Sequence, residues 1–140
     1  MKKFEFIDIT TADVAFVAYG KTLAEMFANA ALAMFEVMIN TKEVRHKIKQ
    51  EITVSGNDMP SLMFNWLNKL IVFVDAENVV FSRFNVIVDE KLFTLKALCF
   101  GEKIDQKRHE LRTVVKSATY HKMEIKKKAG LWQAQVILDI

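Results

Sequence analysis

The chain has 140 residues, of which 51% are hydrophobic and 26% charged, with four glycines and one proline. This length fits a single domain over residues 1–140, and this composition excludes disordered, low-complexity and fibrous proteins. The longest unbroken apolar run, Ala30 to Phe35, is far shorter than the roughly 20 residues of a membrane span. Glu5 lies where a signal peptide would begin its apolar segment. We therefore expect a cytoplasmic protein that has no contact with a membrane.

The net charge of +3 is unevenly distributed: residues 101–140 carry nine basic and five acidic side chains, whereas residues 1–100 carry 11 and 12. A basic segment can attract an acidic partner or a nucleic acid. The three lysines at 126–128 precede Ala129-Gly130, however, a pattern typical of a hairpin turn. No aromatic residues alternate with these lysines, as an RNA-stacking sheet requires. The charge alone therefore does not predict a nucleic-acid-binding protein.

Two short apolar segments near the N-terminus, Phe4–Ile9 and Val14–Tyr19, are expected to pair as strands around a turn at residues 10–13. The second segment is apolar on both faces, which predicts a central strand.

A helix is predicted from Thr22 to Met38. Thr22 and Glu25 have the spacing of a capping box, in which each side chain accepts a hydrogen bond from a main-chain donor at the helix start. Apolar residues recur at intervals of three and four, and they are Leu23, Met26, Phe27, Ala30, Ala31, Met34, Phe35 and Met38. The methionines would also suit an adaptable binding groove, but Phe27 and Phe35 on the same stripe favour core packing.

A strand with one buried face is predicted from Val44 to Val54, with a half-buried His46 on its apolar side. A second helix is predicted from Met59 to Val74, capped by Asp58. This helix carries apolar residues on so many sides that we expect it to lie deeper than the first. Trp66 is interpreted as a core anchor rather than a platform for a ligand.

A hairpin is predicted from Phe81–Val88 and Leu92–Phe100, which would bury Cys99 as a small apolar residue. Residues 105–116 are ambiguous between a short helix and a turn leading into a strand. A last hairpin is predicted from Tyr120–Lys127 and Leu131–Leu138.

These elements contain no regular strand–helix–strand repeat, so antiparallel pairing is expected. The sequence therefore predicts an α+β single-domain sandwich, in which two amphipathic helices pack on one mainly antiparallel sheet or on a pair of them.

Candidate chemical groups are few, because the sequence has no nucleophile elbow, glycine-rich phosphate loop or His/Cys metal cluster. Asp13 directly precedes a predicted central strand, and Asp139 lies next to the α-carboxylate of Ile140. Carboxylates this close repel each other unless a proton, a cation or a basic side chain offsets them. If Asp13 approached them, the oxygens would suit Ca²⁺ or Mg²⁺. From the pattern alone, however, Asp13 as a turn residue and Asp139 as a frayed end are the favoured interpretations.

Lys116 and His121 are five residues apart, so on a regular strand they point to opposite faces, and joint action would require a bend. His109 lies in a polar stretch and is expected to be exposed. The pattern gives neither histidine a role as a general acid or base.

Taken together, the chain resembles the archease family over essentially its full length. The likeness rests on several short motifs in a fixed order. They are Thr11-Ala12-Asp13-Val14, Ala18-Tyr19-Gly20, residues 29–35, Phe81-Ser82-Arg83-Phe84, Gly101-Glu102, His109-Glu110-Leu111, Val115-Lys116, Thr119-Tyr120-His121 and the terminal residues 136–140.

The resemblance implies a non-enzymatic activator of an RtcB-type RNA ligase, which promotes guanylylation of the ligase's active-site histidine and multiple turnover in tRNA splicing. It also implies a relaxed nucleotide preference of the ligase and only indirect association with tRNA. A divalent-cation site, calcium by preference with Mg²⁺ or Mn²⁺ as alternatives, would map onto Asp13, Asp139 and Ile140. Lys116 and His121 would contact the partner.

The sequence departs from the family pattern at Thr10, Ala15 and Ser117, where histidine, glycine and alanine are usual. The missing histidine weakens any role for a ring nitrogen beside Asp13 and leaves an oxygen-only site. Three other functions remain open: a chaperone of a tRNA-modifying enzyme such as a methyltransferase, a metal-dependent hydrolase, and direct RNA binding.

Overall fold

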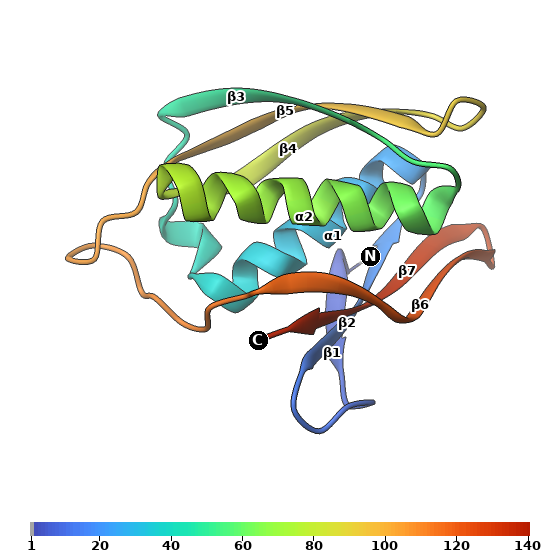
Figure 1. Cartoon of the computed structure of the whole chain (residues 1–140), viewed down its shortest axis with the longest axis horizontal. Helices are drawn as coiled ribbons and strands as arrows, with labels where there is room; N and C mark the ends of the chain where they lie inside the picture. The colour runs from blue at the N-terminus through green and yellow to red at the C-terminus, as the bar shows by residue number, and fades with distance from the viewer. Residues whose placement is uncertain (1) are drawn as a thin grey trace.

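The computed structural model describes residues 2–140, which form one α+β domain in three layers (Figure 1). A four-stranded sheet has the order β1-β2-β7-β6, a three-stranded sheet has the order β3-β5-β4, and every strand pair is antiparallel. The two helices lie between the sheets, and each contacts both of them (Figure 1). The predicted fold class is confirmed, and of the two arrangements that it allowed, the pair of sheets is the one found.

The strands are β1 (Phe4–Ile7), β2 (Val14–Gly20), β3 (Ile48–Ser55), β4 (Val79–Asp89), β5 (Thr94–Lys103), β6 (Ser117–Lys128) and β7 (Leu131–Asp139). The helices are α1 (Leu23–Met38) and α2 (Met59–Glu77), and a single 3₁₀ turn, η1, covers Thr41–Glu43. Neither helix in the described part of the chain combines the length and apolar character needed to cross a membrane.

Helix α1 begins where predicted, and the Thr22 side chain accepts a hydrogen bond from the Glu25 N–H over 3.1 Å. The second bond of the predicted capping box is replaced, since the Glu25 carboxylate accepts from the Lys21 N–H over 3.4 Å. The predicted apolar stripe is buried except at Met38, which is half-buried. Asn29, off that stripe, is buried as well, and its amide donates to the Tyr19 carbonyl over 2.7 Å. A helix between two sheets has more than one buried face, so its polar residues need internal partners.

Helix α2 also begins as predicted, with a capping box between Asp58 and Ser61, but it runs three residues beyond the predicted end, to Glu77. The expectation that it lies deeper than α1 is wrong: six of its residues are buried, against nine in α1, and Val72 is 55% exposed. Trp66 is a core anchor, since it is fully buried and its indole N–H donates to the Phe27 carbonyl.

Strand β3 begins at Ile48, four residues later than predicted. Before it, the Arg45 N–H donates to the Glu102 carboxylate over 2.7 Å instead of joining the sheet. His46 therefore falls outside the strand and is exposed, which corrects its predicted half-buried position. The His46 ring lies 2.9 Å from the Ser82 hydroxyl.

The β4–β5 hairpin buries Cys99 completely, as predicted, and burial raises the pKa of its thiol to about 12. Phe93, which falls within the predicted strand Leu92–Phe100, instead lies in the turn with a positive φ of 51°. The β6–β7 hairpin turns at Ala129-Gly130, where both residues have positive φ, the geometry of a two-residue turn matched to strand twist.

Candidate functional site

The pairing of β2 with β7 brings the two predicted acidic residues to one end of the four-stranded sheet. Val14 pairs with Leu138, and the register continued by one step places Asp13 opposite Asp139. Side chains alternate along a strand, so both carboxylates fall on the side of the sheet away from the helices. Both residues are half-buried. Chain segments more than 120 residues apart thus meet at this point.

The pairing of β6 with β7 adds Lys116 to the same corner. Ser117 pairs with Asp139, and the Lys116 N–H donates to the Asp139 carbonyl over 2.8 Å. One further step of the register places Lys116 opposite Ile140, so by the same alternation the side chains of these two residues fall on the sheet face opposite to the two carboxylates. The fold therefore gathers Asp13, Asp139, Ile140 and Lys116, which we call the carboxylate corner.

His121 does not join the carboxylate corner. Between Thr119 and Glu124 five steps of β6 match only two of β7, from Ile137 to Gln135, so β6 bulges outward. Lys122 in this bulge has a positive φ of 52°. The bend that joint action of Lys116 and His121 requires is present, but it leaves His121 exposed farther along β6.

The donors of the carboxylate corner are all oxygens, the ligands that Ca²⁺, Mg²⁺ and Mn²⁺ prefer. Within residues 2–140 no group of three or more His, Cys, Asp or Glu side chains is arranged to hold a metal ion. The corner has two such side chains, Asp13 and Asp139, and its third contributor, Ile140, has main-chain oxygens only. Its chemistry fits a hard cation, and its donors are fewer than the six to eight oxygens that Ca²⁺ takes.

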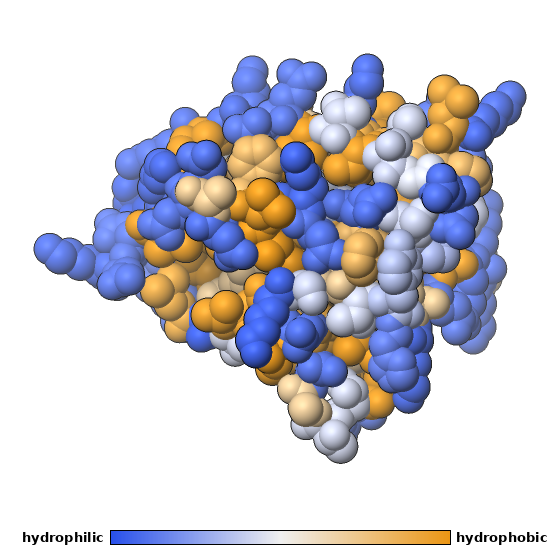
Figure 2. Space-filling model, in the orientation of Figure 1, coloured by the Kyte–Doolittle hydropathy of each residue, from blue (hydrophilic) through white to orange (hydrophobic). Residues whose placement is uncertain are grey.

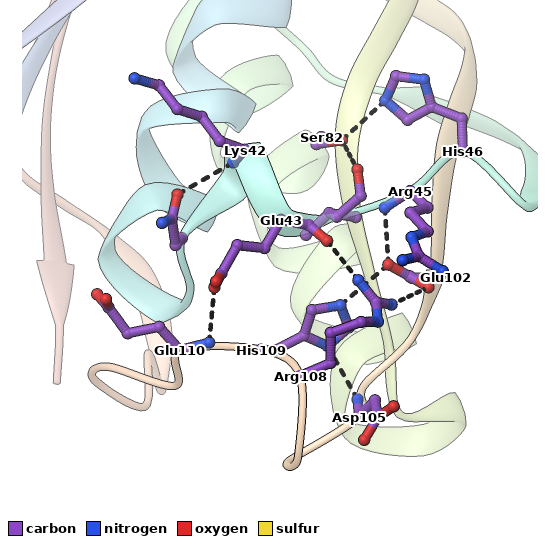
Figure 3. Close-up of polar contacts among 12 residues, drawn as sticks. Lys42, Glu43, Arg45, His46, Ser82, Glu102, Asp105, Arg108, His109 and Glu110 are labelled. Carbon is purple, nitrogen blue, oxygen red and sulfur yellow. Dashed lines mark hydrogen bonds and ion pairs between the residues drawn. The ribbon is translucent and has the colours of Figure 1, made fainter.

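A buried ionic network lies at the start of the loop over residues 104–116, which leads to Lys116 (Figure 3). The Glu102 carboxylate, 4% exposed, accepts hydrogen bonds from the His109 ring over 2.9 Å and from the Arg108 guanidinium. The Asp105 N–H donates to His109 Nδ1 over 2.9 Å, so the ring proton lies on Nε2 and points at Glu102. His109 is 5% exposed, and its predicted exposure is wrong.

These bonds decide the ionisation of Glu102. Burial by itself raises the pKa of this carboxyl, but the hydrogen bonds from Arg108, the Arg45 N–H and His109 outweigh burial and lower the pKa to about 2. The ionised carboxylate thus joins three segments: the end of β5, the chain before β3 and the loop 104–116.

The rest of the loop follows the C-terminal end of α1. The N–H groups of Arg112 and Thr113 donate to the carbonyls of Met38 and Val37, which have no partner within the helix. The Arg112 guanidinium donates to the Glu36 carbonyl and, over 2.6 Å, to the Glu36 carboxylate. A cation at a helix C-terminus is favourable, and α1 has no basic residue in its own last turn. The ambiguous segment is thus an irregular loop held to α1, and it delivers Lys116 to β7.

Sequence reasoning missed Glu102, Arg108 and Arg112 as structural partners. The motifs Gly101-Glu102 and His109-Glu110-Leu111 were the available signal, since they contain both ends of the His109–Glu102 bond. The sequence pattern alone, however, does not show that His109 and Glu102 pair across a turn.

Comparison with known proteins places the chain clearly. The model of the Archease protein family matches residues 4–140. Protein archease of Sulfurisphaera tokodaii is 44% identical over 140 residues, covering 100% of both chains. That of Methanothermobacter thermautotrophicus is 45% identical over 142 residues, again covering 100% of both.

Solved structures agree. The solution structure of a Methanobacterium thermoautotrophicum protein superposes with a TM-score of 0.87 at 45% identity and covers 100% of both chains. A crystal structure from Thermotoga maritima, described as an archease and possible chaperone, has a TM-score of 0.69 at 20% identity, covers 94% of this chain and 93% of that one, and supports the fold alone. From the full-length family match and these relatives, the chain belongs to the archease family.

Proposed function

We propose that the protein activates an RtcB-type RNA ligase by promoting guanylylation of the ligase's active-site histidine, so that each ligase molecule turns over many times. For this activity the chain supplies no catalytic residue, associates with tRNA indirectly through the ligase, and relaxes the ligase's nucleotide preference. Family membership supports this assignment, and the observation that carries it is the meeting of Asp13, Asp139 and Lys116 at one accessible end of the sheet.

The carboxylate corner is proposed to hold a divalent cation, Ca²⁺ first and Mg²⁺ or Mn²⁺ as alternatives. Asp13 and Asp139 would supply carboxylate oxygens and Ile140 main-chain oxygens. When bound, the cation offsets the repulsion between the acids and can neutralise phosphate charge. Because the corner offers fewer donors than the ion takes, the remaining positions are left for water or for groups of the ligase.

Lys116 supports the proposal from the other side of the corner. Its main chain is fixed by the bond to Asp139, while its side chain is exposed. An ammonium held in this way can form a charge-assisted hydrogen bond to a phosphate or a ligase carboxylate. His121, exposed on the β6 bulge, is proposed as a second contact on the strand that follows Lys116.

The test is single-turnover guanylylation of a ligase from the same genome, with the wild-type chain and with Asp13→Ala, Asp139→Ala and Lys116→Ala. Glu90→Ala, in the exposed β4–β5 turn, and Lys128→Ala, at the exposed end of β6, are the matched controls. The proposal expects each corner variant to slow guanylylation at least about tenfold, equivalent to about 1.4 kcal/mol, and the controls to act like wild type. Full activation by all three corner variants would remove the proposal.

A second candidate is a chaperone for a tRNA-modifying enzyme such as a methyltransferase. The archease of Thermotoga maritima is described as a possible chaperone, and the family match of this chain, rather than the 20% identity, is what brings that function into consideration. The discriminating measurement is aggregation of the client enzyme on heating with and without this chain. Suppressed aggregation that Asp13→Ala leaves intact, together with unchanged ligase turnover, would select this function over the first.

A further inference from the structure

The three-stranded sheet has one face without a helix on it. Both helices pack on the other face, where the side chains of Ile52, Ala97 and Cys99 are buried (Figure 1). In Figure 1 the free face is the upper side of the sheet formed by β3, β5 and β4, and the helices lie below that sheet. Figure 2 shows the same edge, with hydrophilic side chains projecting among hydrophobic ones.

An aromatic ring stands in the middle of this face with a cation on each side. Phe100 on the central strand pairs with Lys49 on β3 and with Arg83 on β4, so the three side chains form one row. The Arg83 guanidinium carbon lies over the Phe100 ring, 5.2 Å from its centroid. The His46 ring lies 6.3 Å from that centroid, tilted by 55°. Phe100 is half-buried, and Lys49, Arg83 and His46 are exposed.

The next row of the same face adds polar and apolar groups. Leu98 pairs with Glu51 and with Asn85, and it lies about 7 Å along β5 from Phe100. A hollow of about 180 Å³ opens here, and its lining includes Glu51, Asn85, Lys96 and Leu98. An exposed amide beside a hollow is a donor and acceptor for the polar edge of a planar ligand.

The charge around Phe100 is strongly positive. The exposed cations are Arg45, Lys47, Lys49, Arg83 and Lys96, and Glu51 is the exposed acid among them. Arg45 and Lys47 also line a wide groove of about 540 Å³ at the end of the sheet, where Lys103 and Arg108 add two more cations beside Glu102 and Asp105. A polyanion laid across the sheet would meet these cations in succession.

We propose that this face, the Phe100 face, binds single-stranded RNA. A base stacks on the platform of Phe100 and Arg83, the phosphates pair with Lys49, Lys47 and Arg45, and the next base lies over Leu98 within reach of Asn85. Single-stranded nucleic acid is the ligand whose chemistry matches both the aromatic platform and the surrounding cations. Its unstacked bases stack on aromatic or guanidinium planes, and its phosphates bind in basic grooves. A protein partner would account for the apolar ring but not for five cations around it. The inference goes beyond ligase activation and does not depend on it.

The test measures fluorescence anisotropy of a labelled oligouridine of about ten nucleotides with the full chain alone, at about 0.1 M salt. The expected dissociation constant lies within roughly 10⁻⁶–10⁻⁴ M. Phe100→Leu keeps an apolar side chain and removes the aromatic plane, so binding should weaken about tenfold. Lys47→Gln with Lys49→Gln should weaken binding and lower the slope of log affinity against log salt by about 1.4, since two phosphate contacts are lost. An RNA duplex of equal length should bind more weakly than the single strand, because its bases stay stacked.

Lys128→Gln, which removes one exposed cation from the opposite sheet, is the matched control and should bind like wild type. Circular dichroism verifies the fold of each variant, and Arg83→Gln alone replaces Phe100→Leu if the latter unfolds. The proposal is overturned by absence of binding, by equal losses in Lys128→Gln and Lys49→Gln, or by unchanged affinity of a folded Phe100→Leu. Loss of ligase activation by Phe100→Leu with RNA affinity intact would make the face a protein-binding surface and also contradicts it. Because no ligase enters the binding assay, its failure is separate from failure of the proposed function.

Discussion

His109 donates a hydrogen bond from Nε2 to the buried Glu102 carboxylate over 2.9 Å. This bond connects the loop over residues 104–116, which leads to Lys116, with β5, the central strand of the three-stranded sheet. The same carboxylate also accepts bonds from Arg108 and from the Arg45 N–H. Residues of the family motifs thus position a loop, and the end of that loop forms one side of the carboxylate corner.

Replacing Glu102 by glutamine should destabilise the protein by about 2 kcal/mol, because the amide leaves Arg108 without its anionic partner and cannot accept every bond that the carboxylate accepts. Urea denaturation followed by circular dichroism measures the change. Glu124→Gln, at an exposed ion pair on the β6–β7 hairpin, is the control and should stay within about 0.5 kcal/mol of wild type. Equal effects of the two variants would argue against the network.

Stability should also depend on pH through Glu102. Its pKa is 4.5 in the reference state and about 2 in the fold, so the ionised carboxylate stabilises the fold fully above about pH 4.5. That contribution is lost as the pH falls from 4.5 towards 2. The urea midpoint of wild type should therefore drop more steeply over this range than that of Glu102→Gln. Parallel pH profiles of the two proteins would contradict the lowered pKa.

The Cys99 thiol should be unreactive in the native protein. It is fully buried and burial raises its pKa to about 12, so little thiolate is present and none is accessible. An aromatic disulfide reagent at about pH 8 should label the native chain slowly and the unfolded chain at once, with one thiol per chain. Rapid labelling of the native protein would place Cys99 outside the core.

Two glycines should respond differently to alanine. A Cβ on Gly101 would lie 1.8 Å from the Val80 carbonyl oxygen, so β4 would have to move away from β5, at a cost of about 3 kcal/mol. Gly130 has a φ of 79° and open space around it, so Gly130→Ala should cost only about 1 kcal/mol of backbone strain. Thermal unfolding of both variants checks the order, and a milder effect at Gly101 than at Gly130 would contradict the close approach of the strands.

The features that could be predicted are those that depend on residues close together in the sequence. Thr22 and Asp58 cap their helices because the capping bond joins residues three apart, a distance that the sequence itself displays. The β6–β7 turn is local in the same sense, since Ala129-Gly130 alone must adopt positive φ.

The predictions that were wrong concern features that depend on contacts with residues elsewhere in the chain. His109 is polar and lies in a polar stretch, yet a carboxylate seven residues away makes its burial favourable. His46 left its predicted strand because Glu102 takes the Arg45 N–H. The apolar composition of α2 predicted that the helix lies deeper in the core than it does, since Val72 is exposed.

The carboxylate corner could not be predicted from the sequence pattern for the same reason. No pattern joins Asp13 to Asp139, because their proximity depends on β2 pairing with β7 across the length of the chain. Family resemblance supplied these residues, and the strand register now gives a physical reason for their proximity. Their role in binding a cation and a ligase remains a prediction.

The decisive measurement for the proposed function is single-turnover guanylylation of an RtcB-type ligase from the same genome, with the wild-type chain and with Asp139→Ala. Asp139 is the residue that both neighbours, Asp13 and Lys116, meet. Guanylylation should be at least about tenfold slower with Asp139→Ala and should proceed at the wild-type rate with the folded control Glu90→Ala. Wild-type guanylylation by a folded Asp139→Ala protein would contradict the proposed function.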